Sequence, residues 1–130
     1  MADNKLYIKE RDILFEIMQS GDNEEVIRWY DENAILYDEQ FNSCGFIYHL
    51  TTTETVCKVA PDKTAVILDV GAGSGVIGKL LHDHGYCTID AVDASEGMLK
   101  IAAQKNIYRS LTCAKIGTEP IKNLKECEYL

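Results

Sequence analysis

The chain has 130 residues, with 46% hydrophobic and 26% charged residues, a composition typical of one globular domain and not of a disordered chain. Its formal charge of −8, with no long run of basic residues, argues against a nucleic-acid partner, because phosphate binding needs clustered positive charge. The N-terminus resembles no signal peptide, and no apolar run approaches the ~18 residues of a membrane span. We therefore expect no membrane association and a location in the cytoplasm or the nucleus.

The cysteines and histidines of the chain show no metal-binding pattern. The five cysteines are scattered and form no C-x-x-C pair, which is typical of reduced intracellular thiols. His82 and His84 fall near the end of a predicted helix, where the helix dipole or solvent explains them better than a ligand pair does. His49 falls on another predicted helix and is expected to be structural. We predict no metal site.

Residues 1–62 are expected to form a helical cap. Apolar side chains at helical spacing predict a helix over Leu6–Ser20, and a capping pattern at Asp22 predicts a second, short helix. Asn33–Gly45 is polar and aromatic without a sustained period, so we expect a loop or lid there. A third helix is predicted over Phe46–Val59.

Residues 63–130 alternate between strand and helix patterns. Strands are predicted at Thr64–Val70, Cys87–Val92 and Ser110–Ile116, and helices at Val76–His84 and from Ser95 to about Gln104. This βαβαβ order predicts the α/β class, with an open, mostly parallel, Rossmann-like sheet. The tail Gly117–Leu130 shows no strong period.

The turn after the first predicted strand has the features of a ligand site. Gly71, Gly73 and Gly75 allow a tight turn and a close approach of a ligand to the backbone. Asp93 follows Gly73 by 20 residues, which is the separation expected of a carboxylate that binds ribose hydroxyls. Both features fall at carboxyl ends of strands, where open α/β sheets bind ligands.

Spacing alone leaves two cofactors open. The run from Gly73 to Gly78 matches the G-x-G-x-x-G pattern of dinucleotide-binding proteins, so an NAD(P)-dependent oxidoreductase is one alternative. Against it, Asp69 adds a second carboxylate at a strand end, where a pyrophosphate needs none. The ammonium and sulfonium charges of S-adenosylmethionine would suit that carboxylate.

The run DVGAGSG resembles motif I of the class I methyltransferases, and VDASEGML resembles the element that follows it. Within that class, the runs YDEN and IYRSLTCAKIGTEPI resemble the methyltransferase-like group named after the Williams–Beuren syndrome chromosome region. The resemblance implies S-adenosylmethionine as cofactor and a small molecule or a protein as methyl acceptor. A catalytic base is needed only for an acceptor that must lose a proton, and we assign no catalytic residue.

The resemblance also implies cofactor contacts. Asp69 would face the methionine end, Asp93 would bind the ribose, and the loop Gly71, Ala72, Gly73 and Gly75 would lie beneath the cofactor. Ala94 and Met98 would flank the adenine. Many of these enzymes place an aspartate just after the third strand to bind the adenine amino group. In this chain the backbone of Ile116 or Gly117, or the Glu119 side chain, would take that role. The segment from Trp29 to Asp38 is similar to an entry segment that folds over the cofactor, which makes Tyr37 a lid contact.

The Rossmann-like fold ordinarily continues past its third strand, with a fourth strand beside the first. The predicted pattern ends before that, so we expect a fold truncated after the third strand. Val66–Val70 of the first predicted strand would then form an apolar edge, open to pairing with a partner chain. A non-catalytic, cofactor-binding or partner-binding fragment or short isoform is therefore a further alternative to an active methyltransferase.

Overall fold

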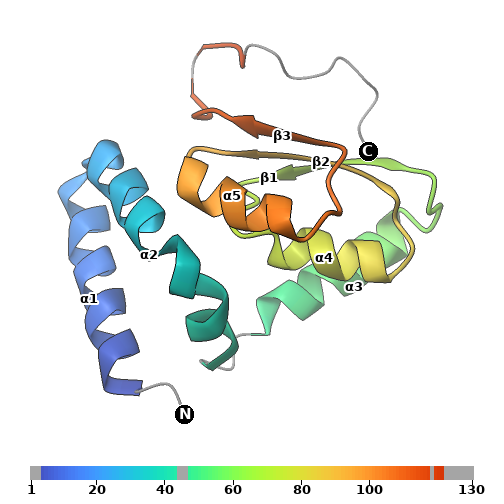
Figure 1. The fold of residues 1–130 in the computed structure, drawn as a ribbon. Coiled ribbons are helices and arrows are strands. Elements are labelled where there is room, and N and C mark those ends of the chain that lie inside the picture. The colour runs from blue at the N-terminus through green and yellow to red at the C-terminus, as the bar shows by residue number, and fades with distance from the viewer. Residues whose placement is uncertain (1–3, 44–46, 118, 122–130) are drawn as a thin grey trace.

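The structure is a computed structural model, and it describes residues 4–43, 47–117 and 119–121 (Figure 1). These form five helices and three strands: α1 (Asn4–Ser20), α2 (Asn23–Ser43), α3 (Tyr48–Val59), β1 (Val66–Val70), α4 (Val76–Asp83), β2 (Thr88–Asp93), α5 (Glu96–Gln104) and β3 (Ser110–Cys113). The α/β class and the order of elements predicted from the sequence are confirmed.

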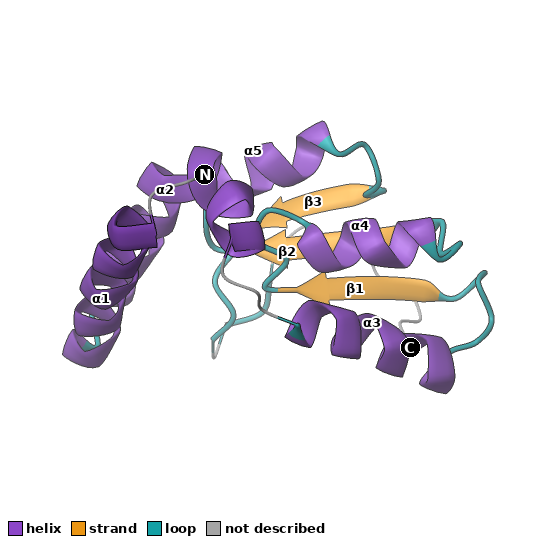
Figure 2. Cartoon of the chain, turned by 90° about the horizontal axis from the view of Figure 1, so that it is seen from below, coloured by secondary structure: helices purple, strands orange, loops and turns teal. Residues whose placement is uncertain are grey.

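The sheet is parallel and has the strand order β1-β2-β3 in the described part of the chain. Val66 pairs with Thr88 and Val70 with Val92, so β1 and β2 end at the same level. Helices α4 and α5 lie over one face of the sheet, and α1 and α2 lie beyond the carboxyl ends of the strands (Figure 2). The N-terminal helices therefore stand where an open α/β sheet binds its ligands.

The core between the sheet and its helices is centred on Leu81, Tyr86 and Ile89, which are at most 2% exposed. Apolar side chains are expected at such positions, but Tyr86 carries a hydroxyl that needs a partner once buried. That hydroxyl donates to the Ala60 carbonyl at 2.6 Å. Tyr86 thereby ties the end of α3 to the start of β2.

A charged pair joins β2 to β3. The Asp90 carboxylate is fully buried, and the Arg109 guanidinium donates to it from Nε at 3.0 Å and from Nη2 at 2.5 Å. A two-pronged contact of this kind matches the planar carboxylate and offsets the unfavourable burial of its charge. The pair lies where the segment before β3 meets the middle of β2, and it supports the register Asp90 to Ser110.

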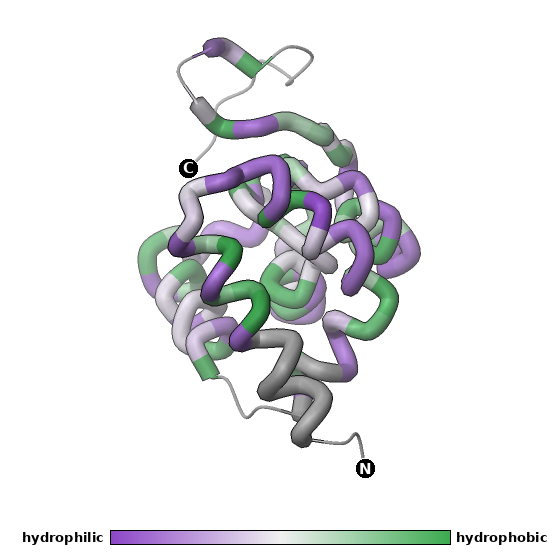
Figure 3. Tube along the Cα trace, turned by 90° about the vertical axis from the view of Figure 1, so that its left-hand side faces the viewer, coloured by the Kyte–Doolittle hydropathy of each residue, from purple (hydrophilic) through white to green (hydrophobic). Residues whose placement is uncertain are grey.

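The prediction of a loop over Asn33–Gly45 is wrong as far as Ser43, because α2 continues through that segment. Residues Cys44–Gly45 lie outside the described residues. Trp29, Ala34 and Phe41 of α2 are buried. Apolar and polar stretches alternate along the helices in Figure 3, as expected of amphipathic helices packed on one side.

Several strand and helix boundaries also differ from the predictions, most of them by one or two residues. β3 ends at Cys113 rather than Ile116, and β1 begins at Val66 rather than Thr64. The Asp62 carboxylate accepts the Thr64 N–H and hydroxyl, which holds Thr64 in a turn instead of the strand. No helix in the described ranges is long and apolar enough to cross a membrane.

A side-chain contact fixes α4 on the sheet. The Tyr108 hydroxyl donates to the Asp69 carboxylate of β1 at 2.7 Å, and its ring lies against Gly75 and Gly78 of the loop and α4. A Cβ built on Gly78 would lie 2.1 Å from the Tyr108 oxygen and 2.4 Å from Cζ. Glycine at this position is therefore required by the packing of Tyr108.

We expect Gly78→Ala to lower the free energy of unfolding by about 1–3 kcal/mol, because overpacking forces a shift of Tyr108 or α4. The measurement is urea unfolding of the wild type and the variant. The double variant with Tyr108→Ala should show a smaller effect of Gly78→Ala, since the clashing ring is gone. Gly117→Ala is the control, because the space around Gly117 is open. Equal stabilities of Gly78→Ala and the wild type would contradict this packing.

Candidate cofactor-binding site

The loop after β1 is attached to the end of β2 through backbone hydrogen bonds. Gly71 and Ala72 donate their N–H groups to the Val92 carbonyl at 2.8 and 3.2 Å. One step further, Gly73 N–H donates to the Asp93 carboxylate at 2.9 Å. The glycine loop and the acidic residue that the sequence singled out therefore form one structural unit.

Asp93 uses both carboxylate oxygens in this unit. Oδ2 accepts from Gly73, and Oδ1 accepts from the Ser95 N–H at 2.8 Å. Each oxygen has a second lone pair, so the carboxylate can accept further hydrogen bonds from a ligand. Asp93 is only partly buried, which leaves it accessible.

The loop glycines have backbone conformations that other residues adopt rarely. Gly71, Gly73 and Gly75 have φ values of 70°, 56° and 89°. A Cβ on Gly73 would also lie 3.2 Å from the Met98 terminal methyl group, so the loop and α5 pack closely here. The turn is thus set by its glycines, and it presents backbone to the space beneath α2.

Three neighbouring cavities surround this loop, and each of them touches Gly71. The first, the Ile116 cavity, has a volume of about 250 Å³ and a mostly apolar wall. It is lined by Val26, Ile27, Tyr30, Gly71, Val92, Asp93, Ala94, Ser95, Ala114 and Ile116. A flat, largely apolar ring is the kind of group such a wall accepts.

The second, the Asp93 cavity, has a volume of about 210 Å³ and lies between α2 and the loop. It is lined by Tyr30, Tyr37, Gly71, Gly73, Asp93 and Met98. Tyr30 and Asp93 also line the Ile116 cavity, so the two cavities are neighbours. A carboxylate in this position provides acceptors for ligand hydroxyl groups.

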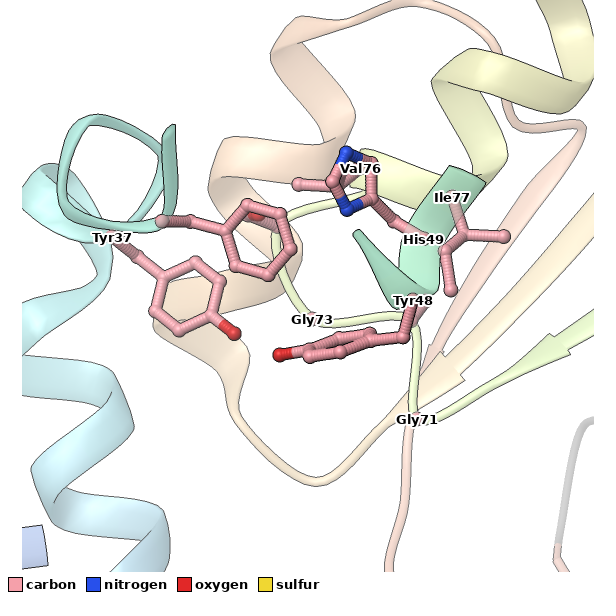
Figure 4. Close-up of a pocket in the computed structure, with 10 residues that line it drawn as sticks. Tyr37, Tyr48, His49, Gly71, Gly73, Val76 and Ile77 are labelled. Carbon is pink, nitrogen blue, oxygen red and sulfur yellow. The ribbon is translucent and has the colours of Figure 1, made fainter. Parts of the chain in front are cut away.

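The third, the Tyr48 cavity, has a volume of about 160 Å³ and is lined by aromatic side chains and the loop. Its wall consists of Tyr37, Phe41, Tyr48, His49, Gly71, Ala72, Gly73, Ser74, Val76 and Ile77. In Figure 4 the hydroxyls of Tyr37 and Tyr48 point toward each other across the cavity, with Gly71 and Gly73 beside them. His49 lines this space, and its Nδ1 is buried without a hydrogen-bond partner in the described ranges.

Eight of the eleven predicted cofactor contacts line these cavities. They are Tyr37, Gly71, Ala72, Gly73, Asp93, Ala94, Met98 and Ile116. The walls of the three cavities do not include Asp69, Gly75 or Gly117. Gly75 and Asp69 instead contact Tyr108, and Gly117 is exposed beyond β3.

Asp69 is a half-buried acid near the end of β1, outside the walls of the three cavities. Burial is the main cause that raises the pKa of its carboxyl above the ordinary value of 3.8, the Tyr108 hydrogen bond lowers that pKa, and the charge of Asp93 raises it. Burial, followed by the charge of Asp69, also raises the pKa of the Tyr108 hydroxyl. Tyr108 therefore stays protonated and remains a donor to Asp69.

Tyr30, Tyr48 and Tyr108 were missed by sequence reasoning. Tyr30 lies seven residues before Tyr37, so both fall on one side of a continuous helix, a signal hidden by the predicted loop. Tyr48 and Tyr108 reach the site only through the tertiary fold, and nothing in the local sequence indicates their partners.

Comparisons with known proteins point to the same segment. Residues 67–125 match the family model described as a methyltransferase domain. Over 99 residues the chain is 29% identical to Methyltransferase-like protein 27 of Homo sapiens, an alignment that covers 73% of this chain and 40% of that protein. The chain thus spans less than half the length of this relative. Both matches are to methyltransferase sequences.

We expect Asp69→Asn to raise the melting temperature at pH 7. The folded protein binds the Asp69 proton more tightly than the unfolded chain does, so stability falls as pH rises from 3.8 through the raised pKa. The Asn carbonyl can still accept from Tyr108 without carrying a charge.

Calorimetric melting at pH 7 and at a pH below 3.8 tests this, and the advantage of the variant should shrink at the lower pH. Asp83→Asn is the control of opposite sign, because the Lys79 hydrogen bond lowers the pKa of Asp83. A variant less stable than the wild type at pH 7 would contradict the account of Asp69.

Proposed function

We propose that this chain binds S-adenosylmethionine and supports methyl transfer to a small molecule or a protein side chain. The observation that carries the proposal is the joint placement of the glycine loop and Asp93 between an apolar cavity and an aromatic one. The methyltransferase-domain match over residues 67–125 supports it.

The walls of the cavities suit the three parts of this cofactor. The Ile116 cavity, with Ala94 and Val26, would hold the adenine. The Asp93 carboxylate would accept hydrogen bonds from the ribose hydroxyls. The Gly71–Gly73 backbone and Tyr37 would hold the methionine end in the Tyr48 cavity. The order adenine, ribose, methionine follows from the residues that neighbouring cavities share. Tyr30 and Asp93 line both the Ile116 and the Asp93 cavity, and Tyr37 lines both the Asp93 and the Tyr48 cavity.

The bound cofactor would supply a methyl group on a sulfonium, which is already a good leaving group. The remaining task is positioning, and holding two reactants in line lowers a barrier substantially. The aromatic wall of the Tyr48 cavity would exclude water and orient the acceptor. A proton acceptor is needed only for acceptors that must lose a proton, and we assign that role to no residue.

On the motif resemblance, we further propose a relation to the Williams–Beuren group. On the scattered cysteines, we propose a location in the cytoplasm or the nucleus. A partner chain on the β1 edge also remains a proposal. Detection of a methylated acceptor would distinguish an enzyme from a non-catalytic cofactor-binding module.

The decisive experiment is calorimetric titration of the purified chain with S-adenosylmethionine, S-adenosylhomocysteine and NAD. We expect binding of the first two and none of NAD, because Asp69 adds a second carboxylate at the strand end, where a pyrophosphate needs none. Preference for NAD would establish the oxidoreductase alternative. Absence of binding by all three ligands would overturn the proposed function.

We expect Asp93→Ala to weaken S-adenosylhomocysteine binding by about tenfold or more, since a hydrogen bond to a charged group contributes about 1.5–3 kcal/mol. The same titration measures this effect. Circular dichroism checks folding, because Asp93 also accepts from Gly73 and Ser95. Asp83→Ala, on the exposed end of α4, is the matched control. Unchanged affinity in a folded Asp93→Ala variant would show that Asp93 does not bind the ligand.

A further inference from the structure

Helix α2 carries two aspartates, Asp31 and Asp38, that are bonded to the Rossmann-like part of the chain. They are seven residues apart, which is two helical turns, so both lie on one side of α2. Each directly follows a tyrosine that lines the cavities, Tyr30 or Tyr37. On α2 the two tyrosines therefore face the cavities, and the two carboxylates contact α5 and the glycine loop.

Asp31 is bonded to the start of α5. Its Oδ1 accepts the Ser95 hydroxyl at 2.5 Å and the Gly97 N–H at 2.9 Å. The Ser95 oxygen in turn accepts the Met98 N–H at 3.1 Å, so this residue caps α5 and binds α2 at once. A carboxylate at a helix N-terminus is further favoured by the helix dipole.

The approach of α2 at this point is close enough to require glycine. A Cβ on Gly97 would lie 2.9 Å from the Asp31 Cα and 3.0 Å from its carbonyl oxygen. Both are backbone atoms and cannot move away without moving α2. Gly97 is therefore part of the docking contact.

Asp38 is bonded to the glycine loop and to the end of α5. It accepts the Ser74 hydroxyl, and its Oδ2 lies 2.6 Å from Lys105 Nζ. Lys105 Nζ also donates to the Ser74 carbonyl at 2.5 Å. The ammonium group is only partly exposed and joins α2, the loop and α5 in one contact.

The partners of the two aspartates are themselves cavity residues. Ser95 lines the Ile116 cavity, and Ser74 lines the Tyr48 cavity. A displacement of α2 would therefore remove Tyr30 and Tyr37 from the site and free Ser74 and Ser95 together.

We propose that Asp31 and Asp38 are positioning residues that dock α2 over the cofactor site through Ser95–Gly97 and Ser74–Lys105, and that cofactor affinity depends on this docking although neither aspartate lines the cavities. The affinity part rests on the proposed function. The docking part concerns the protein without ligand and is tested separately.

The first test is hydrogen exchange in the ligand-free chain. Lys105→Met and Gly97→Ala should accelerate exchange of α2 amides while leaving the β1 and β2 amides protected. Lys100→Met, an exposed position on α5, is the matched control. Unchanged α2 exchange in both Lys105→Met and Gly97→Ala would overturn the docking.

The second test is calorimetric titration with S-adenosylhomocysteine. Lys105→Met and Asp38→Asn should each weaken binding by about fivefold to tenfold, within the range expected for a partly exposed, charge-assisted contact. The double variant should lose less than the product of the two, because both remove the same ion pair. Glu39→Gln, exposed beside Asp38, should bind as the wild type does.

The two ideas fail in different ways. A wild-type chain that binds neither S-adenosylmethionine nor S-adenosylhomocysteine overturns the proposed function, and the exchange data then decide the docking alone. A wild-type chain that binds, with Lys105→Met and Asp38→Asn binding equally well, overturns the dependence of affinity on docking.

Discussion

The parallel pairing of β1 with β2 is the constraint from which the site follows. Because Val70 pairs with Val92, the two strands end side by side, and the loop after β1 is drawn to the end of β2. The hydrogen bond from Gly73 N–H to Asp93 is a direct consequence of this register. A slip of one residue would place Asp93 on the opposite face and separate the carboxylate from the glycine turn.

The site has a second half that the sheet does not provide. Helix α2 closes the space above the loop with Tyr30 and Tyr37. Polar contacts join it to α5, since Asp31 and Asp38 reach the start and end of that helix. Polar contacts of this kind exchange more readily with water than a packed core does.

Local sequence signals predicted the parts of the structure that depend on local physics. The glycine turn, the Ser95 cap and the strand–helix alternation were predicted because each requires particular residues at fixed spacing. The extent of α2 was not predicted, because the buried residues Ala34 and Phe41 are separated by mostly polar or exposed positions and show no sustained helical period. The Tyr108–Asp69 contact joins residues 39 positions apart, and only the completed fold brings them together.

The glycine pattern shows why the spacing left two cofactors open. In a dinucleotide-binding turn, the third glycine of G-x-G-x-x-G permits close packing of helix on strand. Gly78 occupies that position and has a different reason to be glycine, because Tyr108 fills the space where a Cβ would lie. The same three glycines thus satisfy the pattern through another packing partner. Because Tyr108 explains why residue 78 is glycine, Gly78 is not evidence for a dinucleotide. The same tyrosine donates its hydroxyl to Asp69, the acid that precedes the turn.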